Sequence, residues 1–543
     1  MPTCRELKPV IIEVLATALA DALSELGIDV APSEIHMERP AHREHGDWSS
    51  NVALVVSKKA GREPRELAAD LVKTLESTPD AQIQRLEVAG PGFVNFHLSS
   101  QWLHDVLIDV VSQGENGYAR SEIGNGQSIN LEFVSANPTG PLHAGGGRWG
   151  AYGDSLARIF RRCGYTTFTE YYINDRGLQT ELFGASLLAR RDGTELPEDG
   201  YAGEYVAEWA SEMPADVDPV EWGSERALTD VRQSLASMNV TFDHWASEKA
   251  LIDSGAMETA LEALRAGGWV DDSDGATWLR TSEFGDEKDR VLVKSDGAPT
   301  YFVPDIAYHH QKFDRGNLVI DILGADHHGY VPRMSAALQM LGHQAASYEA
   351  IIGQNVTLVR RGKEVKLSKR TGTMVEVREL LEAVGPDVAR FAYLLQSIDT
   401  RQTIDIDMLS SQANENPVYY VQYAYARIAS VGREADNRGI TRSPLIETDP
   451  TLLTHERELE LLRALSTLPE TIEMAARDRA PHKISTWIRE LAAAFHGFYH
   501  DCPVLRSDVE SDLQQARLWL VESARVGFSI GLELLGLTAP EEM

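Results

Sequence analysis

The spacing of apolar residues changes twice along the chain, and each change marks a predicted domain boundary. Near the N-terminus, apolar positions recur about every 3.6 residues over residues 9–26 and again over 51–77, where Gly61 interrupts the pattern. Residues 86–99 instead alternate apolar and polar positions after a Gly-Pro-Gly, as a short strand does. These elements predict an N-terminal α+β domain over residues 1–118.

From residue 128 onward the pattern becomes that of a parallel α/β sheet. The apolar run 128–134 predicts a buried strand, a turn-rich loop follows, and residues 148–164 have apolar positions at helical spacing. A further strand is predicted over residues 166–173. A strand, a helix and a second strand in this order form the repeating unit of a doubly wound, Rossmann-like α/β fold.

The α/β domain, which we assign to residues 119–385, is interrupted. Residues from about 190 to 282 are rich in Asp, Glu, Gly and Trp and show no strong sheet pattern, so we expect a helical insertion there. Strand-like runs resume at 289–295, 317–324 and 349–359. The sheet is therefore predicted to be split around the insertion.

The last part of the chain, residues 386–543, is periodic at about 3.6 residues. We predict an all-α helix bundle there, because short connections join amphipathic segments of helical length. The segments are 386–398, 415–435, 456–478, 484–501 and 513–536.

Composition and charge narrow the function classes only a little. The chain has 82 acidic and 51 basic side chains and a net charge of −31 at pH 7, which argues against unspecific binding of nucleic acid. We find no run of about 18 apolar residues that would span a membrane. Cys4, Cys163 and Cys502 show neither disulfide nor metal-site spacing, so we expect a reducing cytoplasm and no protein-bound metal.

The loop before the helix 148–164 contains a G-x-G-x-x-G, formed by Gly145, Gly147 and Gly150. This is the fingerprint of dinucleotide-binding enzymes, and Glu170 follows where a ribose-binding acid belongs. In that fingerprint, however, the first glycine comes directly after the strand. Here a loop with two prolines separates the strand from Gly145. We therefore reject the interpretation as an oxidoreductase.

The other interpretation is a nucleotide site at a helix start. His143 directly precedes the small residues 144–147. Small residues let a nucleotide lie against the backbone, and the N–H groups of a helix N-terminus attract phosphate. A histidine there can donate to a phosphoryl oxygen as negative charge develops. From the residue alone, a capping or packing role for His143 stays open.

A second, distant segment strengthens the nucleotide interpretation. Three cations and three hydroxyls surround a glycine-containing loop, namely Lys366, Ser368, Lys369, Arg370, Thr371 and Thr373. Cations in such a loop can spread over a triphosphate and favour the departure of pyrophosphate. A solvated basic loop is the alternative. The chain has no P-loop motif that would offer a rival triphosphate site.

Together these motifs resemble a known family. "HAGG" and "KLSKR" are similar to the HIGH and KMSKR motifs of class I aminoacyl-tRNA synthetases. More specifically, "LEFVSANPTGPLHAGG", "TEYYINDRG", "PTYFVPDIAYHHQKF", "GADHHGY" and "NENPVYYVQYAYARI" resemble arginyl-tRNA synthetases. The resemblance covers essentially the whole chain, with "VAGPGFVNFHL" similar to that family's N-terminal domain.

The resemblance implies a fold and an activity. The fold is a Rossmann-like catalytic domain with a helical insertion, between an N-terminal α+β domain that binds the tRNA elbow and a C-terminal helix bundle that binds the anticodon. The activity is the activation of L-arginine with ATP and Mg²⁺ and its transfer to the 3′ end of tRNA(Arg). The family further implies a cytoplasmic monomer.

The resemblance also implies the residues of each site. Those for ATP are His143, Gly145, Gly146, Asp326, His327, Lys366, Ser368, Lys369 and Arg370, of which His143, Lys366 and Lys369 act in catalysis. Those for arginine are Glu132, Asn137, His143, Tyr301, Asp305 and His327. Those for tRNA are Asn51, Phe93, Tyr423, Arg427 and Met543. Folding roles for Asn51 and Phe93 remain an alternative.

Within the arginine site, Glu132 and Asn137 are expected to hold the α-amino and carboxylate region, and Asp305 to face the guanidinium beside Tyr301. An unpaired carboxylate on a buried strand is costly, which favours a bound cation next to Glu132. Asp305 is alternatively the N-cap of the helix that follows it.

The chain departs from the family pattern at two positions. Gly146 stands where the HIGH motif usually has its second histidine, and the N–H of Gly147 and the side chain of Arg148 are candidates for the missing donor. Tyr425 stands in a slot that is often histidine, where it affects tRNA contacts or packing. Two rival functions therefore stay open: a tRNA-binding regulator that has lost activation, and a paralogue that uses a different acceptor.

Overall fold

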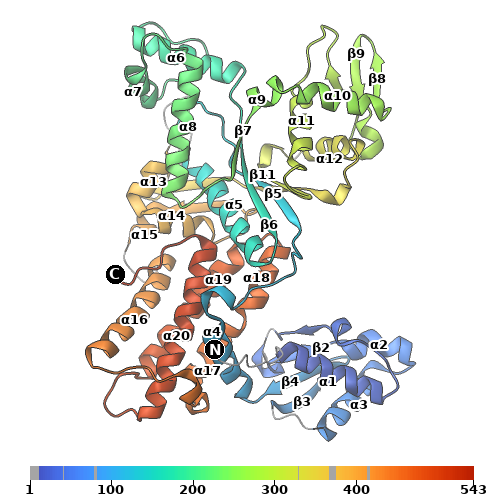
Figure 1. The fold of residues 1–543 in the computed structure, drawn as a ribbon, viewed down its shortest axis with the longest axis vertical. Helices are drawn as coiled ribbons and strands as arrows, with labels where there is room; N and C mark the ends of the chain where they lie inside the picture. Colours follow the sequence, from blue (N-terminus) through green and yellow to red (C-terminus); the bar gives the residue numbers. More distant parts are fainter. Residues whose placement is uncertain are drawn as a thin grey trace. The chain divides into compact units, whose positions relative to one another are not determined.

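The structure is a computed structural model that describes residues 11–40, 42–78, 82–327, 329–365, 375–411 and 416–542. It divides into two compact units (Figure 1). The first contains residues 1–112, 441–466 and 500–523, and the second contains 113–440, 467–499 and 524–543. The first unit therefore combines the N-terminal elements with parts of the C-terminal helices. In the described residues, no helix is both long and apolar enough to cross a membrane.

The first unit has a four-stranded antiparallel sheet with the order β1-β2-β4-β3. Its elements are α1 (Ile11–Glu25), β1 (Met37–Glu38), β2 (Trp48–Ser50), α2 (Val52–Ala60), α3 (Pro64–Ser77), β3 (Ile83–Ala89) and β4 (Phe93–Leu98). The break at Gly61 is confirmed, because this residue ends α2 in the left-handed conformation with φ of 62°. The single strand expected over 86–99 is instead a hairpin, with Gly-Pro-Gly forming its turn.

A five-stranded parallel sheet forms the core of the second unit, with the order β12-β11-β5-β6-β7. Its strands are β5 (Ser128–Glu132), β6 (Thr166–Ile173), β7 (His244–Ser247), β11 (Leu318–Gly324) and β12 (Tyr348–Gly353). The chain moves from the central β5 through β6 to β7, and then returns to the other side for β11 and β12. Ligands of such sheets bind at the carboxyl ends of the strands where the order reverses, here between β5 and β11.

Helix α5 (Ala144–Arg162) follows β5 and approaches it closely because glycines face the strand's end. A Cβ at Gly153 would lie 2.2 Å from the ring of Phe133. Gly147 and Gly150 of the motif also serve packing, since a Cβ at Gly147 would lie 3.0 Å from the ring of Tyr393 and one at Gly150 would lie 3.1 Å from the side chain of Leu235. Glu170 is fully buried and paired with Arg315 and Asn130, so it cannot bind a ribose. Both observations support the rejection of the dinucleotide interpretation.

The stretch 190–282 is mostly helical, but it also holds three short strands. Its helices and their neighbours are α6 (Leu178–Asp192), α7 (Glu204–Glu212), α8 (Pro219–Ser237), α9 (Glu248–Asp253), α10 (Ala256–Ala266), α11 (Phe302–Lys312) and α12 (Val331–Met340). Strand β7 extends the main sheet, whereas β8 (Val270–Ser273) and β9 (Ala276–Leu279) pair with β10 (Arg290–Val293) in a separate antiparallel sheet. Strands of four residues are too short to show a clear period in the sequence.

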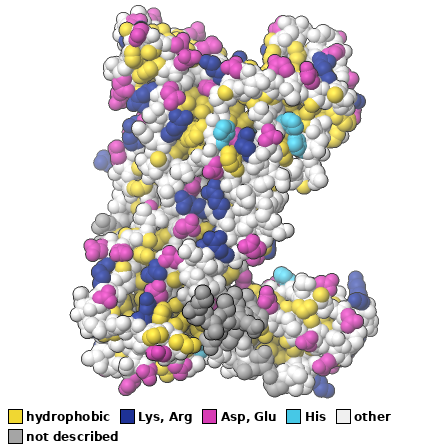
Figure 2. Space-filling model, in the orientation of Figure 1, with side chains coloured by type: hydrophobic (Ala, Val, Ile, Leu, Met, Phe, Trp, Pro, Cys, Tyr) yellow, Lys and Arg dark blue, Asp and Glu magenta, His cyan; other side chains and the backbone are white. Residues whose placement is uncertain are grey.

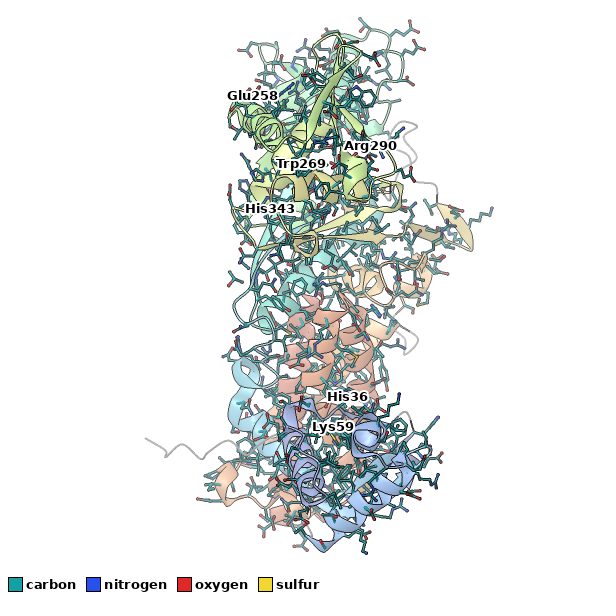
Figure 3. All side chains as sticks on the ribbon, turned by 90° about the vertical axis from the view of Figure 1, so that its right-hand side faces the viewer. His36, Lys59, Glu258, Trp269, Arg290 and His343 are labelled. Carbon is teal, nitrogen blue, oxygen red and sulfur yellow. The ribbon has the colours of Figure 1, made fainter. Side chains whose placement is uncertain are left out.

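The strand expected over 289–295 thus belongs to the small sheet and not to the parallel one. Buried side chains of α10, β9, β10 and α11 form a continuous core under this sheet, and Figure 3 shows Trp269 and Arg290 in this part of the molecule. The run 349–359 is also divided, since β12 ends at Gly353 and β13 (Val356–Arg360) joins a third sheet. The partners of β13 are β14 (Lys363–Val365) and β15 (Gln402–Asp405).

The C-terminal region is helical except for β15 in the part that the structure describes. Its helices are α13 (Val377–Val384), α14 (Pro386–Tyr393), α15 (Ile406–Leu409), α16 (Pro417–Asn437), α17 (Glu456–Ser466), α18 (Leu468–Arg477), α19 (His482–Asp501) and α20 (Ser511–Leu535). The predicted helix 456–478 is two helices, because Pro469 in the first turn of α18 starts a new one. Figure 2 shows acidic side chains scattered over the visible face, as in a solvated surface.

Candidate active site

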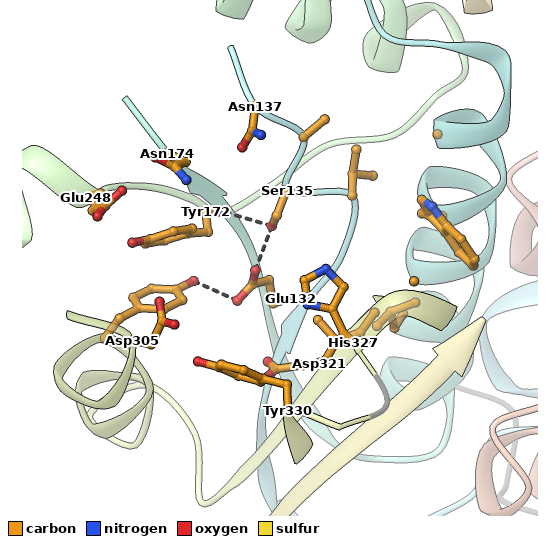
Figure 4. A pocket seen from close by; sticks show the side chains of 18 of the residues that line it. Glu132, Ser135, Asn137, Tyr172, Asn174, Glu248, Asp305, Asp321, His327 and Tyr330 are labelled. Carbon is orange, nitrogen blue, oxygen red and sulfur yellow. Dashed lines mark hydrogen bonds between the residues drawn. The ribbon is translucent and has the colours of Figure 1, made fainter. Parts of the chain in front are cut away.

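A cavity of about 740 Å³ lies at the carboxyl ends of β5 and β11 (Figure 4). This is the position that the reversal of strand order predicts for a ligand site. The cavity brings together seven of the residues expected from the sequence, which are Glu132, Asn137, His143, Gly146, Tyr301, Asp305 and His327.

His143 is the N-cap of α5 and lines the cavity. Its Nδ1 accepts a hydrogen bond of 2.9 Å from the N–H of Gly146. In a neutral ring this bond places the proton on Nε2, which is then a donor. Capping and donation to a phosphate are therefore compatible roles of the same imidazole. The N-terminal N–H groups of α5 add positive potential at this place.

The basic motif, with Lys366, Ser368, Lys369 and Arg370, lies outside the described residues. The chain that follows it is attached to the His143 turn by two main-chain hydrogen bonds. Ala144 donates to Val375 at 2.9 Å, and Val377 donates to Leu142 at 2.8 Å. Residues only a few positions beyond the motif therefore lie against the start of α5. Met543 and the side chain of Asp326 are also outside the description.

A side chain at Gly146 would require the side chain of Leu142 to shift. A Cβ there would lie 2.7 Å from Cδ1 of the buried Leu142. Arg148 does not supply the missing donor, because it is fully buried and its guanidinium donates to three carbonyl oxygens at 2.7–2.9 Å. These oxygens belong to Gln354, Ser397 and Thr400. The hypothesis that Arg148 replaces the second histidine is wrong.

Beneath the cavity, Lys312 of α11 connects carboxylates on two neighbouring strands. It is fully buried, lies 2.5 Å from Oδ1 of Asp321 on β11, and contacts Oε2 of Glu132 on β5. The hydroxyl of Tyr308 donates to the same Oε2 at 2.9 Å. The cation next to Glu132 is thus the protein's own Lys312, so the burial of Glu132 is no longer a reason to expect a bound cation there.

His309 connects Asp321 to the backbone of α11. Its Nδ1 lies 2.7 Å from the carbonyl oxygen of Asp305, and its Nε2 lies 2.9 Å from Oδ2 of Asp321. Glu132 and Asp321 therefore share the ammonium of Lys312, and Asp321 also contacts the ring of His309.

Asp305 faces the cavity from α11 and is not a helix cap. The N-cap of α11 is Tyr301, so the capping alternative for Asp305 is wrong. Burial raises the pKa of Asp305 above its usual value, against the opposing effects of His309 and of a hydrogen bond with Tyr330. Tyr301 is 83% exposed and lies at the rim of the cavity.

The sequence interpretation missed Glu248, which begins α9 and lies across the cavity from α11 (Figure 4). Burial, together with the charge of Asp305, raises the pKa of Glu248 to about 7. The side-chain nitrogen of Asn174, in its better-fitting orientation, lies 2.8 Å from Oε2 of Glu248. Among the described residues, neither Glu248 nor Asp305 forms an ion pair, and no Lys or Arg lines the cavity. The site therefore favours a cationic ligand.

A helical signal was present for the missed residues of α11. Tyr308, His309 and Lys312 follow the predicted Asp305 at i+3, i+4 and i+7, which places all four on one face of a helix. No such signal was available for Glu248, because α9 has only six residues.

The residues expected to meet tRNA lie in other parts of the molecule. Asn51 precedes α2 and Phe93 begins β4, and both are half-buried. On α16, the guanidinium of Arg427 lies 4.2 Å from the ring centroid of Tyr423 and donates to its hydroxyl at 3.1 Å. Tyr425 is buried with its hydroxyl 3.4 Å from that of Ser529, so it packs within the helices.

Comparison with known families matches three parts of the chain. Residues 13–98 match the arginyl tRNA synthetase N terminal domain, 222–423 match the catalytic domain described as tRNA synthetases class I (R), and 421–543 match the DALR anticodon binding domain. The Rossmann-like sheet, the cavity at its switch point and these matches define a class I aminoacyl-tRNA synthetase.

Full-length relatives identify the family within this class. The arginine–tRNA ligase of Frankia alni is 45% identical to the chain, and the match covers 100% of both proteins. That of Kineococcus radiotolerans is 44% identical, and the match covers 97% of this chain and 99% of the relative. A structure described as a putative arginyl-tRNA synthetase from Campylobacter jejuni has a TM-score of 0.75 at 33% identity, covering 82% of this chain and 100% of that one. The Thermus thermophilus arginyl-tRNA synthetase shares the fold, with a TM-score of 0.76 at 22% identity over 98% and 100%. The chain belongs to the arginyl-tRNA synthetase family, and the expected fold class is confirmed.

Proposed function

We propose that the chain activates L-arginine with ATP and transfers the arginyl group to the 3′ end of tRNA(Arg). The arginine carboxylate attacks the α-phosphorus and pyrophosphate leaves; a ribose hydroxyl of the tRNA then attacks the carbonyl carbon and AMP leaves. The observation that carries this proposal is a cavity with an excess of carboxylates next to a helix start suited to phosphate. Full-length identity to arginine–tRNA ligases supports it and does not favour the regulatory or altered-acceptor alternatives.

Arginine fits the cavity with its guanidinium between Asp305 and Glu248. A planar guanidinium with five donors is matched by carboxylates that approach from two sides. The α-amino and carboxylate end then lies toward Glu132, Asn137 and His143, so that the reacting carboxylate points to the start of α5. Tyr301 at the rim contacts the bound side chain.

ATP binds at the N-terminus of α5, where Gly145 and Gly146 allow close approach and His143 donates to the phosphate. Asp326 and His327 contact the nucleotide from the loop after β11. Lys366, Ser368, Lys369 and Arg370 neutralise the leaving pyrophosphate, which the attachment of residues 375–377 to the His143 turn supports. Mg²⁺ arrives with ATP as part of the substrate; the described residues contain no group of three or more His, Cys, Asp or Glu placed to hold a metal ion.

Transfer RNA contacts lie on other elements. Tyr423, Arg427 and Met543 are assigned to the anticodon loop, because unstacked bases are read by aromatic stacking and by arginine. Asn51 and Phe93 are assigned to the tRNA elbow. The proposal includes a monomer in the cytoplasm, which light scattering and fractionation test.

The test is arginine-dependent aminoacylation and pyrophosphate exchange by the purified chain, each with and without tRNA. Lys369→Ala is expected to lower the exchange rate by about 10²–10³-fold, as the loss of one transition-state contact does. Lys363→Ala, an exposed lysine of β14 just before the motif, is the matched control and should leave the rate unchanged. A near-normal rate for Lys369→Ala, or charging with another amino acid in preference to arginine, would contradict the proposal.

A further inference from the structure

The position of Lys312 has a consequence that goes beyond charge balance, and this inference rests on the proposed function. Glu132 and Asp321 are direct neighbours in the parallel register of β5 and β11. Two buried carboxylates in adjacent positions repel each other strongly unless a cation lies between them. The ammonium of Lys312 contacts both.

Glu132 in turn holds a strained turn. Val134 and Ser135 have φ of +71° and +40°, which is costly for non-glycine residues and especially for the β-branched Val134. The hydroxyl of Ser135 donates to Oε1 of Glu132 at 2.7 Å and accepts the N–H of Tyr172 at 3.0 Å. Figure 4 shows both bonds, which connect Ser135 of the turn to the end of β5 and to β6. Such strain persists only where surrounding contacts hold it.

The turn forms one wall of the cavity. Residues 134–137 all line it, and the carbonyl oxygen of Ala136 is held by the hydroxyl of Tyr171 at 2.9 Å. The side chain of Asn137 follows directly from this backbone. A change in the charge of Glu132 therefore reaches the wall against which the amino-acid substrate lies.

We propose that Lys312 is a positioning residue for the amino-acid substrate: its ammonium bridges the carboxylates of Glu132 and Asp321, and Glu132 held in this place fixes the turn 134–137 in its strained form. Asp321 has a pKa well below its usual value, because the effects of Lys312 and His309 outweigh that of burial. The other ionisable groups around this pair come from α11, β6, β12 and the cavity wall. They are Tyr308, His309, Glu170 with Arg315, Tyr348 and Asp305.

Removal of the ammonium is expected to make the site depend on a proton. In Lys312→Met, one shared proton compensates the two carboxylates at low pH, which raises the pKa of the pair above that of the unfolded chain. The stability that this proton gives is lost as pH rises through the raised pKa. We expect KM for arginine to rise by about 10–100-fold relative to the unaltered chain, as for loss of a charged hydrogen bond, and this ratio to grow with pH.

The double variant Lys312→Met/Asp321→Asn separates charge from packing. It removes one cation and one anion, so Glu132 no longer lies beside a second buried carboxylate. KM for arginine and its pH dependence should return toward those of the unaltered chain, which a role of Lys312 in filling space would not produce. Arg315→Met is the control, since it removes the 25% exposed partner of the fully buried Glu170, and neither residue lines the cavity. It should lower the unfolding temperature and leave KM for arginine unchanged.

Three measurements decide the proposal: KM for arginine in aminoacylation, arginine binding by calorimetry, and the unfolding temperature, each between about pH 6 and pH 9. No added dependence on pH in Lys312→Met, no recovery in the double variant, or an equal rise in KM for Arg315→Met would each overturn it. The unfolding temperature needs no substrate, so it tests the ion network even if the unaltered chain fails to bind arginine. That failure would overturn the proposed function instead.

Discussion

Two buried ion networks of the second unit differ in how their charges are satisfied. The closed network consists of Asp154, Arg158 and Arg390, and the open network consists of Glu132, Asp321, Lys312, His309, Asp305 and Glu248. In the closed network the guanidinium of Arg390 contacts Asp154 and donates to carbonyl oxygens at the ends of two helices. These belong to Leu535, at the end of α20, and to Met238 and Asn239, after α8.

The closed network is complete within the protein. The last carbonyls of a helix lack partners and have partial negative charge, so a buried guanidinium satisfies them as well as it satisfies a carboxylate. In the open network, Glu132 and Asp321 have internal cations, whereas Asp305 and Glu248 face a cavity. A buried network whose charges all find partners stabilises the fold; one that leaves anions facing a cavity binds a cationic ligand.

The largest effect is expected from breaking the closed network with Arg390→Met. The loss leaves Asp154 with only the partly exposed Arg158 and removes the guanidinium donor of the Leu535 and Met238 carbonyl oxygens, whereas that of Asn239 keeps Arg158. Removal of one partner of a buried ion pair costs about 3–5 kcal/mol. The variant should unfold at a lower urea concentration and a lower temperature than the unaltered chain. KM for arginine, measured at a temperature where the variant is folded, should not change. An unchanged transition would show that the closed network does not stabilise the fold.

In the open network, Glu248→Gln should raise KM for arginine without lowering the stability of the fold. Glutamine keeps the size of the side chain and a carbonyl oxygen for Asn174, but removes a charge that faces the guanidinium. Loss of one charge-assisted hydrogen bond corresponds to a rise in KM for arginine of about 10–100-fold. The unfolding temperature above about pH 7 should not fall, because burial of the ionised carboxylate is unfavourable. A large loss of stability with unchanged KM for arginine would show that Glu248 stabilises the fold and does not bind arginine.

The pH dependence of arginine binding sharpens the comparison further. The pKa of Glu248 is about 7 in the folded chain, above its ordinary value of 4.5, so the empty site holds a proton below neutrality. Guanidinium binding requires the ionised form, and binding therefore releases this proton. KM for arginine should fall by about tenfold from about pH 6 to pH 8, since affinity changes tenfold per pH unit below the pKa. The Glu248→Gln variant should lack this slope, and an unaltered slope would assign it to another group.

The two networks also differ in how far the sequence predicted them. Asp305 and His143 were recognised because each stands in a contiguous motif of the family. Lys312 was not, since its function depends on the register of β5 against β11, which joins residues far apart in the chain. Glu248 follows a strand of only four residues, which has too few positions for a visible period. The parallel sheet itself was predictable because its first two strands alternate with a long helix.

The sequence interpretation failed at Glu132 and at Arg148 for the same physical reason. Spacing alone suggested that Glu132 needs an external cation, because a sequence shows a carboxylate on a buried strand but not the helix packed above it. Likewise Arg148 follows the glycine turn in the chain, yet its guanidinium points to carbonyls of two later segments. Side-chain direction at a crowded helix start is set by tertiary neighbours, which local pattern does not contain.

The smallest effect is expected for Arg158→Met in the closed network. Arg158 lies 2.7 Å from Asp154 through its Nε, but its side chain is 21% exposed, whereas that of Arg390 is 1% exposed. Water already screens the outer guanidinium, so its removal should cost about 0.2–1 kcal/mol. The unfolding transition should shift by much less than in Arg390→Met, with KM for arginine unchanged. Equal shifts in the two variants would mean that both guanidinium groups are needed to neutralise Asp154, and that burial does not decide which partner stabilises the fold.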